Sequence, residues 1–417
     1  MKPRSAAGAA GLKPFDLLIA LDGNGLNGFE GFGGIAKLSC EPGAGRFDIK
    51  VRYFDGIAGG HATQLNPSGT VGFLGNLSQT LLFYDPRTLE EVARCSTLKW
   101  CAPDTFYSSQ THVAWLDDRT FITVLGDSFW KFTLDDLQRP TRLGKHGVTV
   151  PHALKKTPSG NYLCYGAMDH DDHGFANQVG IFDLRDNSHR VVKLPATAWH
   201  LGMHPTKDVF YAPTQRCAAQ EGSWVEYTIA HFKNYLFEID AERAEVTRHL
   251  TIPKDLPGAL TSDVVVTEDE VLYNACASAS IVAVKLSDFR EPRWVDERAS
   301  LWDSVKAART VWSNLVESAS RANIPGQPHV LLKALRATRF SAVDGSYGLQ
   351  RSPDGKWLLS AHRGLNEVRV YSYPSLELVK RVPFPSIREF FPQHFGLLDD
   401  PRLGFHHTAL LPVEAAG

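Results

Sequence analysis

Five histidines stand at comparable positions along the chain, each a few residues ahead of a turn. The clearest two are His61, six residues before Pro67-Ser68-Gly69, and His152, six residues before Pro158-Ser159-Gly160. Looser copies of the pattern complete the set, which is His61, His112, His152, His200 and His407. Neutral imidazoles are good ligands for iron, copper, nickel and zinc. If the fold brought these side chains together, they could hold such an ion.

The histidine pattern belongs to a repeat that runs through the chain. Two further copies carry no histidine, one around Thr261-Ser262-Asp263 and one at Ser346-Tyr347-Gly348, ahead of the turn 352–355. There are then seven copies, mostly spaced by roughly 40 to 60 residues, and such a period is typical of solenoids and propellers. The repeat therefore predicts one unit rather than several unrelated domains.

Each copy fits a group of four short strands. In the second unit the expected strands span 61–65, 71–74, 80–84 and 90–95. Short runs of apolar and aromatic residues between Pro, Gly and Asp turns indicate an all-β fold, and seven such units around an axis predict a seven-bladed β-propeller. The innermost strand of each blade lines the central channel. The repeated histidines, at the head of these strands, are therefore expected to converge at one mouth.

The two ends of the chain are expected to complete one blade together. Three strands, at 16–21, 35–39 and 47–54, precede the first histidine copy, and the last copy, 406–411, closes the chain. We therefore expect the C-terminal strand to pair with the N-terminal strands as the innermost strand of their blade. Residues 1–13 form an expected flexible tail, and residues 14–417 form a single propeller domain.

One segment departs from the strand pattern. Between residues 297 and 321 apolar residues recur at helical spacing with charges between them, and a second short helix is expected at 330–337. The sequence thus predicts a helical insertion of about 297–337 between the sixth and seventh blades. It would either pack on the flank of the propeller or form a lid over the central opening.

Bulk composition excludes some classes of partner. The 417 residues carry a formal net charge of −2, which gives no reason to expect nucleic acid or an anionic membrane as a partner. No apolar run reaches the length of a signal-peptide core or a membrane span. We therefore expect a cytoplasmic protein.

Two resemblances add to this interpretation. The segments Ser352–Ser360 and Val368–Ser372 resemble a repeat of the YVTN and lactonase-like seven-bladed propellers, which implies fold alone because that superfamily contains enzymes and scaffolds. The row of inner-strand histidines is similar in design, though not in sequence, to the carotenoid cleavage oxygenases. Those enzymes are seven-bladed propellers that hold iron on the axis with four histidines.

Other side chains are candidates for the same mouth. His112 is expected to be a fifth ligand or a base, and Tyr347 and Arg363 complete the catalytic candidates. Trp199, Trp224 and Tyr347 would shape an apolar pocket, and the loop 169–173, rich in Asp and His, would surround it. Strand alternation does not decide between His406 and His407, or between His200 and His204, as the inward-facing residue.

The leading functional hypothesis is a metal-dependent oxidoreductase. It would be a non-haem Fe(II) oxygenase, with copper or zinc as other possible ions, and would use dioxygen on an apolar or aromatic organic substrate. The sequence contains no nucleophile elbow, phosphate-binding loop or dinucleotide fingerprint. The alternatives are a lactonase-like hydrolase or isomerase that uses a metal-activated water, and a non-catalytic propeller that binds a partner.

Overall fold

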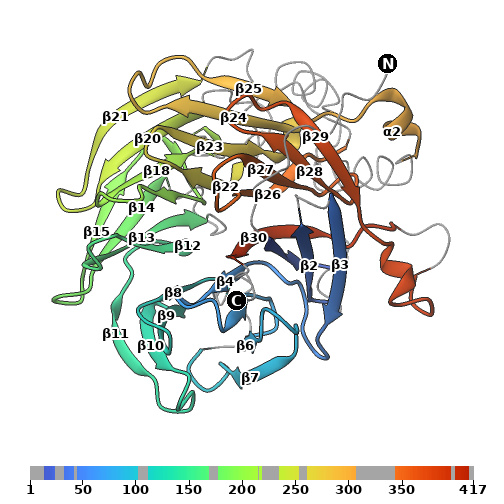
Figure 1. The fold of residues 1–417 in the computed structure, drawn as a ribbon. Coiled ribbons are helices and arrows are strands. Elements are labelled where there is room, and N and C mark those ends of the chain that lie inside the picture. The colour runs from blue at the N-terminus through green and yellow to red at the C-terminus, as the bar shows by residue number, and fades with distance from the viewer. Residues whose placement is uncertain are drawn as a thin grey trace, which may run out of the picture.

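A computed structural model gives the architecture of the protein. It describes residues 14–23, 32–41, 45–101, 111–168, 177–214, 216–217, 234–252, 261–306, 343–395 and 400–412. Figure 1 shows these segments arranged as blades around a central axis. The chain forms seven four-stranded antiparallel sheets, as the sequence predicts for a seven-bladed β-propeller.

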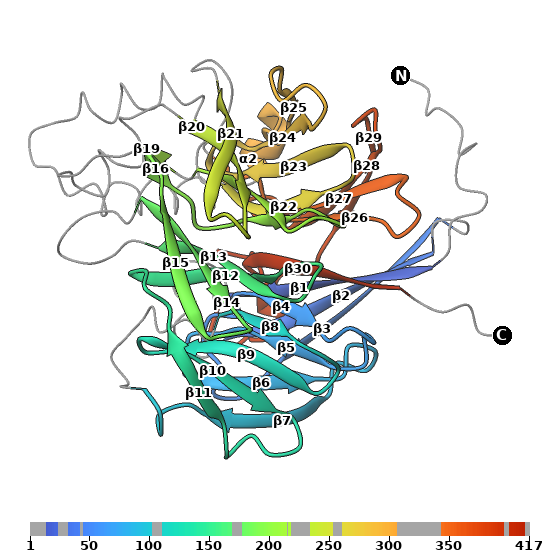
Figure 2. The same cartoon turned by 90° about the vertical axis from the view of Figure 1, so that its left-hand side faces the viewer.

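The first blade contains both ends of the chain. Its strands are β1 (Phe15–Leu21), β2 (Gly34–Glu41), β3 (Arg46–Tyr53) and β30 (Phe405–Pro412). The sheet order β3-β2-β1-β30 makes β30 the innermost strand, paired with β1 from Phe15↔Pro412 to Leu21↔Phe405. Figure 2 shows β1, β2 and β30 side by side. This pairing confirms the predicted closure of the ring.

The other six blades follow in chain order, each from its innermost strand outward. Blades 2 and 3 consist of β4 (Thr63–Leu65), β5 (Gly72–Leu74), β6 (Thr80–Tyr84), β7 (Glu91–Ser96), β8 (Val113–Trp115), β9 (Thr120–Leu125), β10 (Ser128–Thr133) and β11 (Thr141–Lys145). Blades 4 and 5 consist of β12 (Val150–Lys156), β13 (Tyr162–Met168), β14 (Gln178–Asp183), β15 (Ser188–Lys193), β17 (Gly202–Met203), β18 (Val209–Pro213), β20 (Asn234–Asp240) and β21 (Glu245–Ile252). Blades 6 and 7 consist of β22 (Thr261–Val266), β23 (Glu270–Ala275), β24 (Ser280–Lys285), β25 (Arg293–Asp296), β26 (Ser346–Arg351), β27 (Trp357–His362), β28 (Glu367–Ser372) and β29 (Leu378–Pro383).

A few short elements stand outside the blades. Strands β16 (Ala196–Thr197) and β19 (Arg216–Cys217) pair with each other beside blade 5. Two single turns of 3-10 helix are η2 (Cys276–Ser278) and η3 (Ile387–Glu389). Within the described segments, no helix has the length and apolarity needed to cross a membrane.

The hydrophobic core lies between the blades. Each pair of neighbouring blades shares one cluster of buried side chains. Strand β1 shows the cause, because successive side chains of a strand point to opposite faces. Leu17 and Ile19 pack toward blade 7, whereas Leu18 and Ala20 pack toward blade 2. Inner strands are buried on both faces, and this fixes their register around the axis.

The helical insertion begins later than the sequence predicts. Helix α2 spans Leu301–Lys306, whereas Glu297 precedes it and is fully buried between blades 6 and 7. The prediction of a helix from residue 297 was wrong at this end, because Glu297 is held by hydroxyl groups of blade 7 that lie far away in sequence. Asp303 of α2 pairs with Arg381 on the outermost strand β29, which places this turn on the flank. The rest of the insertion, including 330–337, lies outside the described residues.

Candidate metal centre

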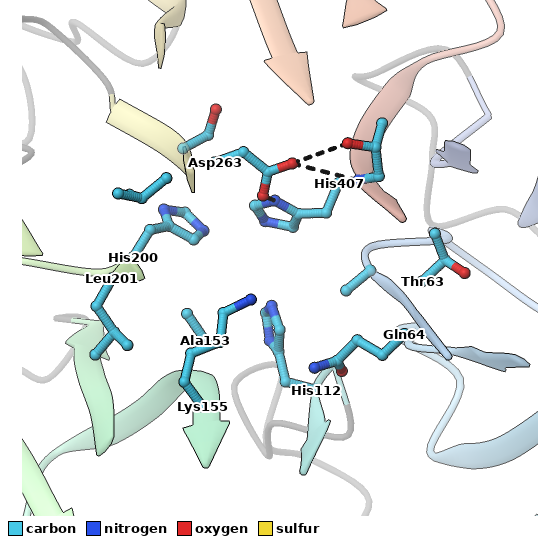
Figure 3. Close-up of a pocket in the computed structure, with 13 residues that line it drawn as sticks. Thr63, Gln64, His112, Ala153, Lys155, His200, Leu201, Asp263 and His407 are labelled. Atoms are coloured by element: carbon cyan, nitrogen blue, oxygen red, sulfur yellow. Dashed lines mark hydrogen bonds and ion pairs between the residues drawn. The ribbon is translucent and has the colours of Figure 1, made fainter. Parts of the chain in front are cut away.

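The five predicted histidines come together on the axis from five different blades. His61, His112 and His200 lie just before the innermost strands of blades 2, 3 and 5, whereas His152 and His407 lie within β12 and β30. Figure 3 shows His112, His200 and His407 directed toward one space. Ring centroids are separated by 4.4 Å for His112 and His152, and by 4.6 Å for His200 and His407. The repeat position thus becomes a spatial cluster.

Backbone bulges shape this cluster. The pairing of innermost strands β12, β22, β26 and β30 with their neighbours shifts by one residue, within His152–Lys155, Thr261–Val264, Ser346–Gly348 and Phe405–Thr408 respectively. A bulge adds one residue to a strand and re-aims the side chains around it. On β30 this explains why two consecutive residues, His406 and His407, both reach the axis, with ring centroids 5.0 Å apart.

The nitrogen atoms of the cluster have the spacing of metal ligands. His61 Nε2 lies 3.2 Å from His152 Nε2, which lies 3.1 Å from His200 Nε2. Two nitrogens bound to one ion at 2.0–2.1 Å would be about 2.9 Å apart at right angles and about 3.3 Å apart in a tetrahedron. The ligand atoms of one group of four, His61, His112, His152 and His407, all lie within 4.8 Å of one another. This group could hold a metal ion.

The outer nitrogens fix where the lone pairs point. His407 Nδ1 donates to Asp263 Oδ1 at 2.7 Å, and His200 Nδ1 donates to the carbonyl oxygen of Thr261 at 3.2 Å. These acceptors place the ring proton on Nδ1, so in the neutral rings both Nε2 atoms carry a lone pair. His407 Nε2 is buried and has no hydrogen-bond partner among the described residues.

The ring nitrogens of the cluster cannot all form good hydrogen bonds with one another. His152 Nε2 faces both His61 Nε2 and His200 Nε2, and His200 Nε2 has no proton to give. If His152 Nε2 carries a proton, that proton can form a good hydrogen bond with only one of the two neighbouring nitrogens. If it carries none, its lone pair faces the lone pair of His200 Nε2. A metal ion at the common point removes this conflict, because every lone pair then has an acceptor.

Burial keeps these rings neutral. It lowers the pKa of His112, His152 and His200 well below the ordinary histidine value, and neighbouring histidines lower it further. The pKa of His61 is lowered for the same reasons, burial first and then His407. A neutral imidazole is the form that binds metals. The site is therefore electrostatically prepared for a cation.

Asp263 also belongs to the cluster, a role that the sequence pattern does not predict. Burial raises the pKa of its carboxyl group, but the interactions with His407, with Lys155 and with the amide of Leu349 together outweigh burial, and the net pKa is lowered. Its Oδ2 accepts from the hydroxyl group of Thr408 at 3.1 Å and from the amide of Leu349 at 3.1 Å. Asp263 thus orients His407 as a carboxylate partner orients many metal-bound histidines. The signal in the sequence was its position in the sixth copy of the repeat.

The sequence leaves two choices open, between His200 and His204 and between His406 and His407, and they have different outcomes. His204 Nδ1 accepts from the amides of Thr206 and Lys207 and caps a turn, so His200 is the residue on the axis. His406 and His407 both lie on the axis. The His406 ring is 4.0 Å from His61 and 4.2 Å from Tyr347, and its Nδ1 is buried without a partner among the described residues. His407 is the one in the compact group of four.

Of the remaining predicted site residues, the structure describes Arg363, Tyr347 and Trp199. Arg363 donates to the carboxylate of Asp22 and, at 3.1 Å, to the carbonyl oxygen of Phe405, and it thereby ties blade 7 to blade 1. Its guanidinium is also 5.6 Å from the ring centroid of Tyr347. Trp199 is buried but does not line the cavity described below. The loop 169–173 and Trp224 lie outside the described residues.

A small cavity adjoins the histidines. Its volume is about 30 Å³, and its walls include His112, His200 and His407 together with Gln64, Lys155 and Asp263. Gln64 and Lys155 follow the histidines along their strands, so the cavity lies on the channel side of the cluster. This volume suits one or two water molecules or another ligand of two or three non-hydrogen atoms. It is too small for an aromatic molecule.

Comparisons with known proteins support the fold. No family profile matches the sequence, and no curated protein matches it. Among solved structures, hydrazine synthase of Kuenenia stuttgartiensis is similar, with a TM-score of 0.54 and 13% identity over 78% of this chain and 87% of the other. The dihydro-heme d1 dehydrogenase NirN has a TM-score of 0.49 and 13% identity, over 92% and 75% of the two chains. The Cps50 (Swd1) β-propeller domain of Myceliophteria thermophila has a TM-score of 0.47 and 12% identity, over 78% and 87%. At such identities the first likeness establishes a shared propeller fold, and it says nothing about activity.

Proposed function

We propose that the protein is a metal-dependent oxidoreductase with a non-haem metal centre on the propeller axis. His61, His112, His152 and His407 are the proposed ligands, and His200 is an adjacent fifth donor. The observation that carries the proposal is the set of inward lone pairs at ligand spacing, with the outer nitrogen of His407 fixed by Asp263. An all-imidazole set suits Fe(II) best for dioxygen chemistry, and copper or zinc also fit.

The geometry supports a division of the site into two sides. The cavity of about 30 Å³ suits dioxygen or water on the channel side of the ion. The organic substrate would approach from the other side, where strand β13 passes the level of His152. Incorporation of both oxygen atoms into the substrate balances the electrons without an external reductant. The absence of a nucleotide-cofactor motif in the sequence agrees with this type of reaction.

Metal analysis combined with one substitution tests this proposal. Wild-type protein loaded anaerobically with Fe(II) should bind close to one equivalent, and nitric oxide should change its spectrum. His407→Ala should lose the iron, because one ligand and the link to Asp263 disappear together. The exposed His189 serves as the matched control, and His189→Ala should bind iron normally. Equal iron binding by His407→Ala and the wild type would contradict the proposed centre.

A hydrolase or isomerase with a metal-activated water is the second candidate. The observation in its favour is the cavity, which has room for water beside the ion. Preferential retention of zinc, with no response of the iron-loaded protein to nitric oxide, would support this candidate. Failure to bind any of these metals would leave a non-catalytic propeller that binds a partner.

A further inference from the structure

Lys155 points toward the metal centre because of a bulge in its strand. His152 pairs with Gly166 and Lys155 pairs with Cys164, so β12 has one residue more than β13 in this interval. The extra residue is accommodated at Ala153, whose backbone φ is 53°. In a regular strand, residues three apart point to opposite faces. The extra residue turns Lys155 to the same side as His152.

The amino group of Lys155 ends inside the cavity. Figure 3 shows the side chain running from β12 into the space between His112, His200 and His407. No described residue accepts a hydrogen bond from it or forms an ion pair with it. Its neighbour Lys156, by contrast, donates to the carbonyl oxygen of Leu116 at 2.8 Å. A lysine aimed into a small cavity without an acceptor is a donor left for a ligand.

The charges around the cavity favour an anion. Asp263 is the one carboxylate among the described residues that line it. It attracts Lys155, but its oxygens already accept hydrogen bonds from His407, Thr408 and Leu349. A divalent ion held by neutral imidazoles and the ammonium group of Lys155 would place three positive charges against this single negative charge. Partly buried charges of one sign repel strongly unless a counter-charge is bound.

We propose that this cavity binds a small monoanion between Lys155 and the metal ion. One end of the anion would coordinate the metal, and the other would accept a charge-assisted hydrogen bond from the ammonium group of Lys155. The volume of about 30 Å³ limits the ligand to two or three non-hydrogen atoms, such as azide or formate. The inference rests on the proposed metal centre, and the experiment below separates the two.

Azide binding to the Cu(II)-loaded protein tests the assignment. Azide should produce a charge-transfer band in the wild type, and Lys155→Met should bind azide about 10- to 100-fold more weakly, as expected for loss of a charge-assisted hydrogen bond. The copper content of Lys155→Met should stay the same, because no ligand is removed. Lys156→Met is the matched control, since that lysine is on the same strand but outside the cavity wall, and it should bind azide as the wild type does.

Further measurements distinguish failure of the anion site from failure of the metal centre. Equal azide affinity in Lys155→Met and the wild type would overturn the anion site while the metal centre stands, and so would loss of copper from Lys155→Met. Benzoate should not displace azide, and if it did, the assignment of a small free anion would be wrong. If the wild type bound no metal, the proposed centre would fail, and the anion site would fail with it because the ion is one of its two partners.

Discussion

Two of the polar clusters among the described residues of this propeller differ in how their atoms are satisfied. The axial cluster consists of the five histidines and Asp263. The seam cluster, between blades 6 and 7, consists of Glu297, Ser346, Ser360, His362, Arg369 and Tyr371. The seam cluster is buried throughout, whereas in the axial cluster His61 and Asp263 are partly exposed and the other four histidines are buried. A buried polar group is costly unless it has a hydrogen-bond partner, so the partners indicate what each cluster is for.

The polar atoms of Glu297 and His362 in the seam cluster have hydrogen-bond partners within the protein. The carboxylate of Glu297 accepts from Ser346 Oγ at 2.6 Å, Ser360 Oγ at 2.5 Å and Tyr371 at 3.0 Å. His362 Nε2 donates to the carbonyl oxygen of Glu297 at 3.0 Å, and its Nδ1 accepts from the amide of Leu365 at 3.2 Å. Both ring nitrogens of His362 therefore have protein partners. This histidine holds two blades together.

Among the described residues, the non-histidine partners of the axial cluster lie on its outer side. There the nitrogens of His407 and His200 are held by Asp263 and by the carbonyl oxygen of Thr261, whereas the inner nitrogens face one another. The difference teaches that burial and residue type do not separate the two kinds of histidine. What separates the axial histidines is a lone pair that the protein orients toward the other rings.

Acidification should have the largest effect on the free energy of unfolding, and it should act through the histidines of both clusters. Burial lowers the pKa of His362 to about 3, and it lowers the pKa of His112, His152 and His200 well below 6.5. Above pH 6.5 neither the folded nor the unfolded state binds these protons. Below pH 6.5 the unfolded state binds them and the folded state does not, so the metal-free protein should lose about 1.4 kcal/mol per pH unit for each buried histidine.

Urea unfolding of the metal-free protein between pH 7.5 and 5 measures this loss. The substitutions His362→Gln and His152→Gln each remove one buried histidine, one from each cluster. Each should reduce the number of protons taken up on unfolding by one. A metal-free protein whose unfolding free energy did not change over this range would contradict the assignment of neutral buried histidines.

Glu297→Ala should have the next largest effect, and on stability alone. The substitution leaves the hydroxyl groups of Ser346, Ser360 and Tyr371 buried without their acceptor, which should lower the free energy of unfolding by about 3 to 5 kcal/mol. The folded fraction should still bind metal as the wild type does. Urea unfolding and metal analysis of the same sample measure both quantities. Loss of metal with unchanged stability would reverse the roles assigned to the two clusters.

The architecture could be predicted from the sequence because it depends on local, repeated signals. The turn repeat predicted the blade number, and the three strands before His61 predicted the closure by β30. The equivalence of His61 and His152 followed from their equal distance to the turn. These inferences needed no knowledge of contacts between distant residues.

The details of the site could not be predicted, for a physical reason. Side-chain direction was inferred from a period of two, and bulges break that period exactly where the site lies. For this reason the choice between His406 and His407 stayed open, and Asp263 and Lys155 received no role. Glu297 was assigned to a helix because its partners Ser346 and Ser360 lie 49 and 63 residues away.

Asp263→Asn should have a smaller effect, confined to the axial cluster. The amide is nearly the same size but carries no charge and can present its NH₂ group to His407 Nδ1. The ring of His407 would then lose its fixed proton position, and metal affinity should fall about 10- to 100-fold, as for other partners of metal-bound histidines. Competition with a chelator of known affinity measures the change. Asp303→Asn, in helix α2 on the flank of the propeller, is the control and should bind metal normally.

Tyr347→Phe should have the smallest effect, and it separates the ring of Tyr347 from its hydroxyl group. Burial raises the pKa of Tyr347 well above its ordinary value, so the hydroxyl group stays neutral. Phenylalanine preserves the ring that packs 4.2 Å from His406 and 5.6 Å from His407. Metal affinity should therefore change by less than about 2-fold and the unfolding free energy by less than about 1 kcal/mol. If the substitution instead released the metal, the hydroxyl group would be part of the centre, and the set of inward-facing donors would extend beyond the histidines to blade 7.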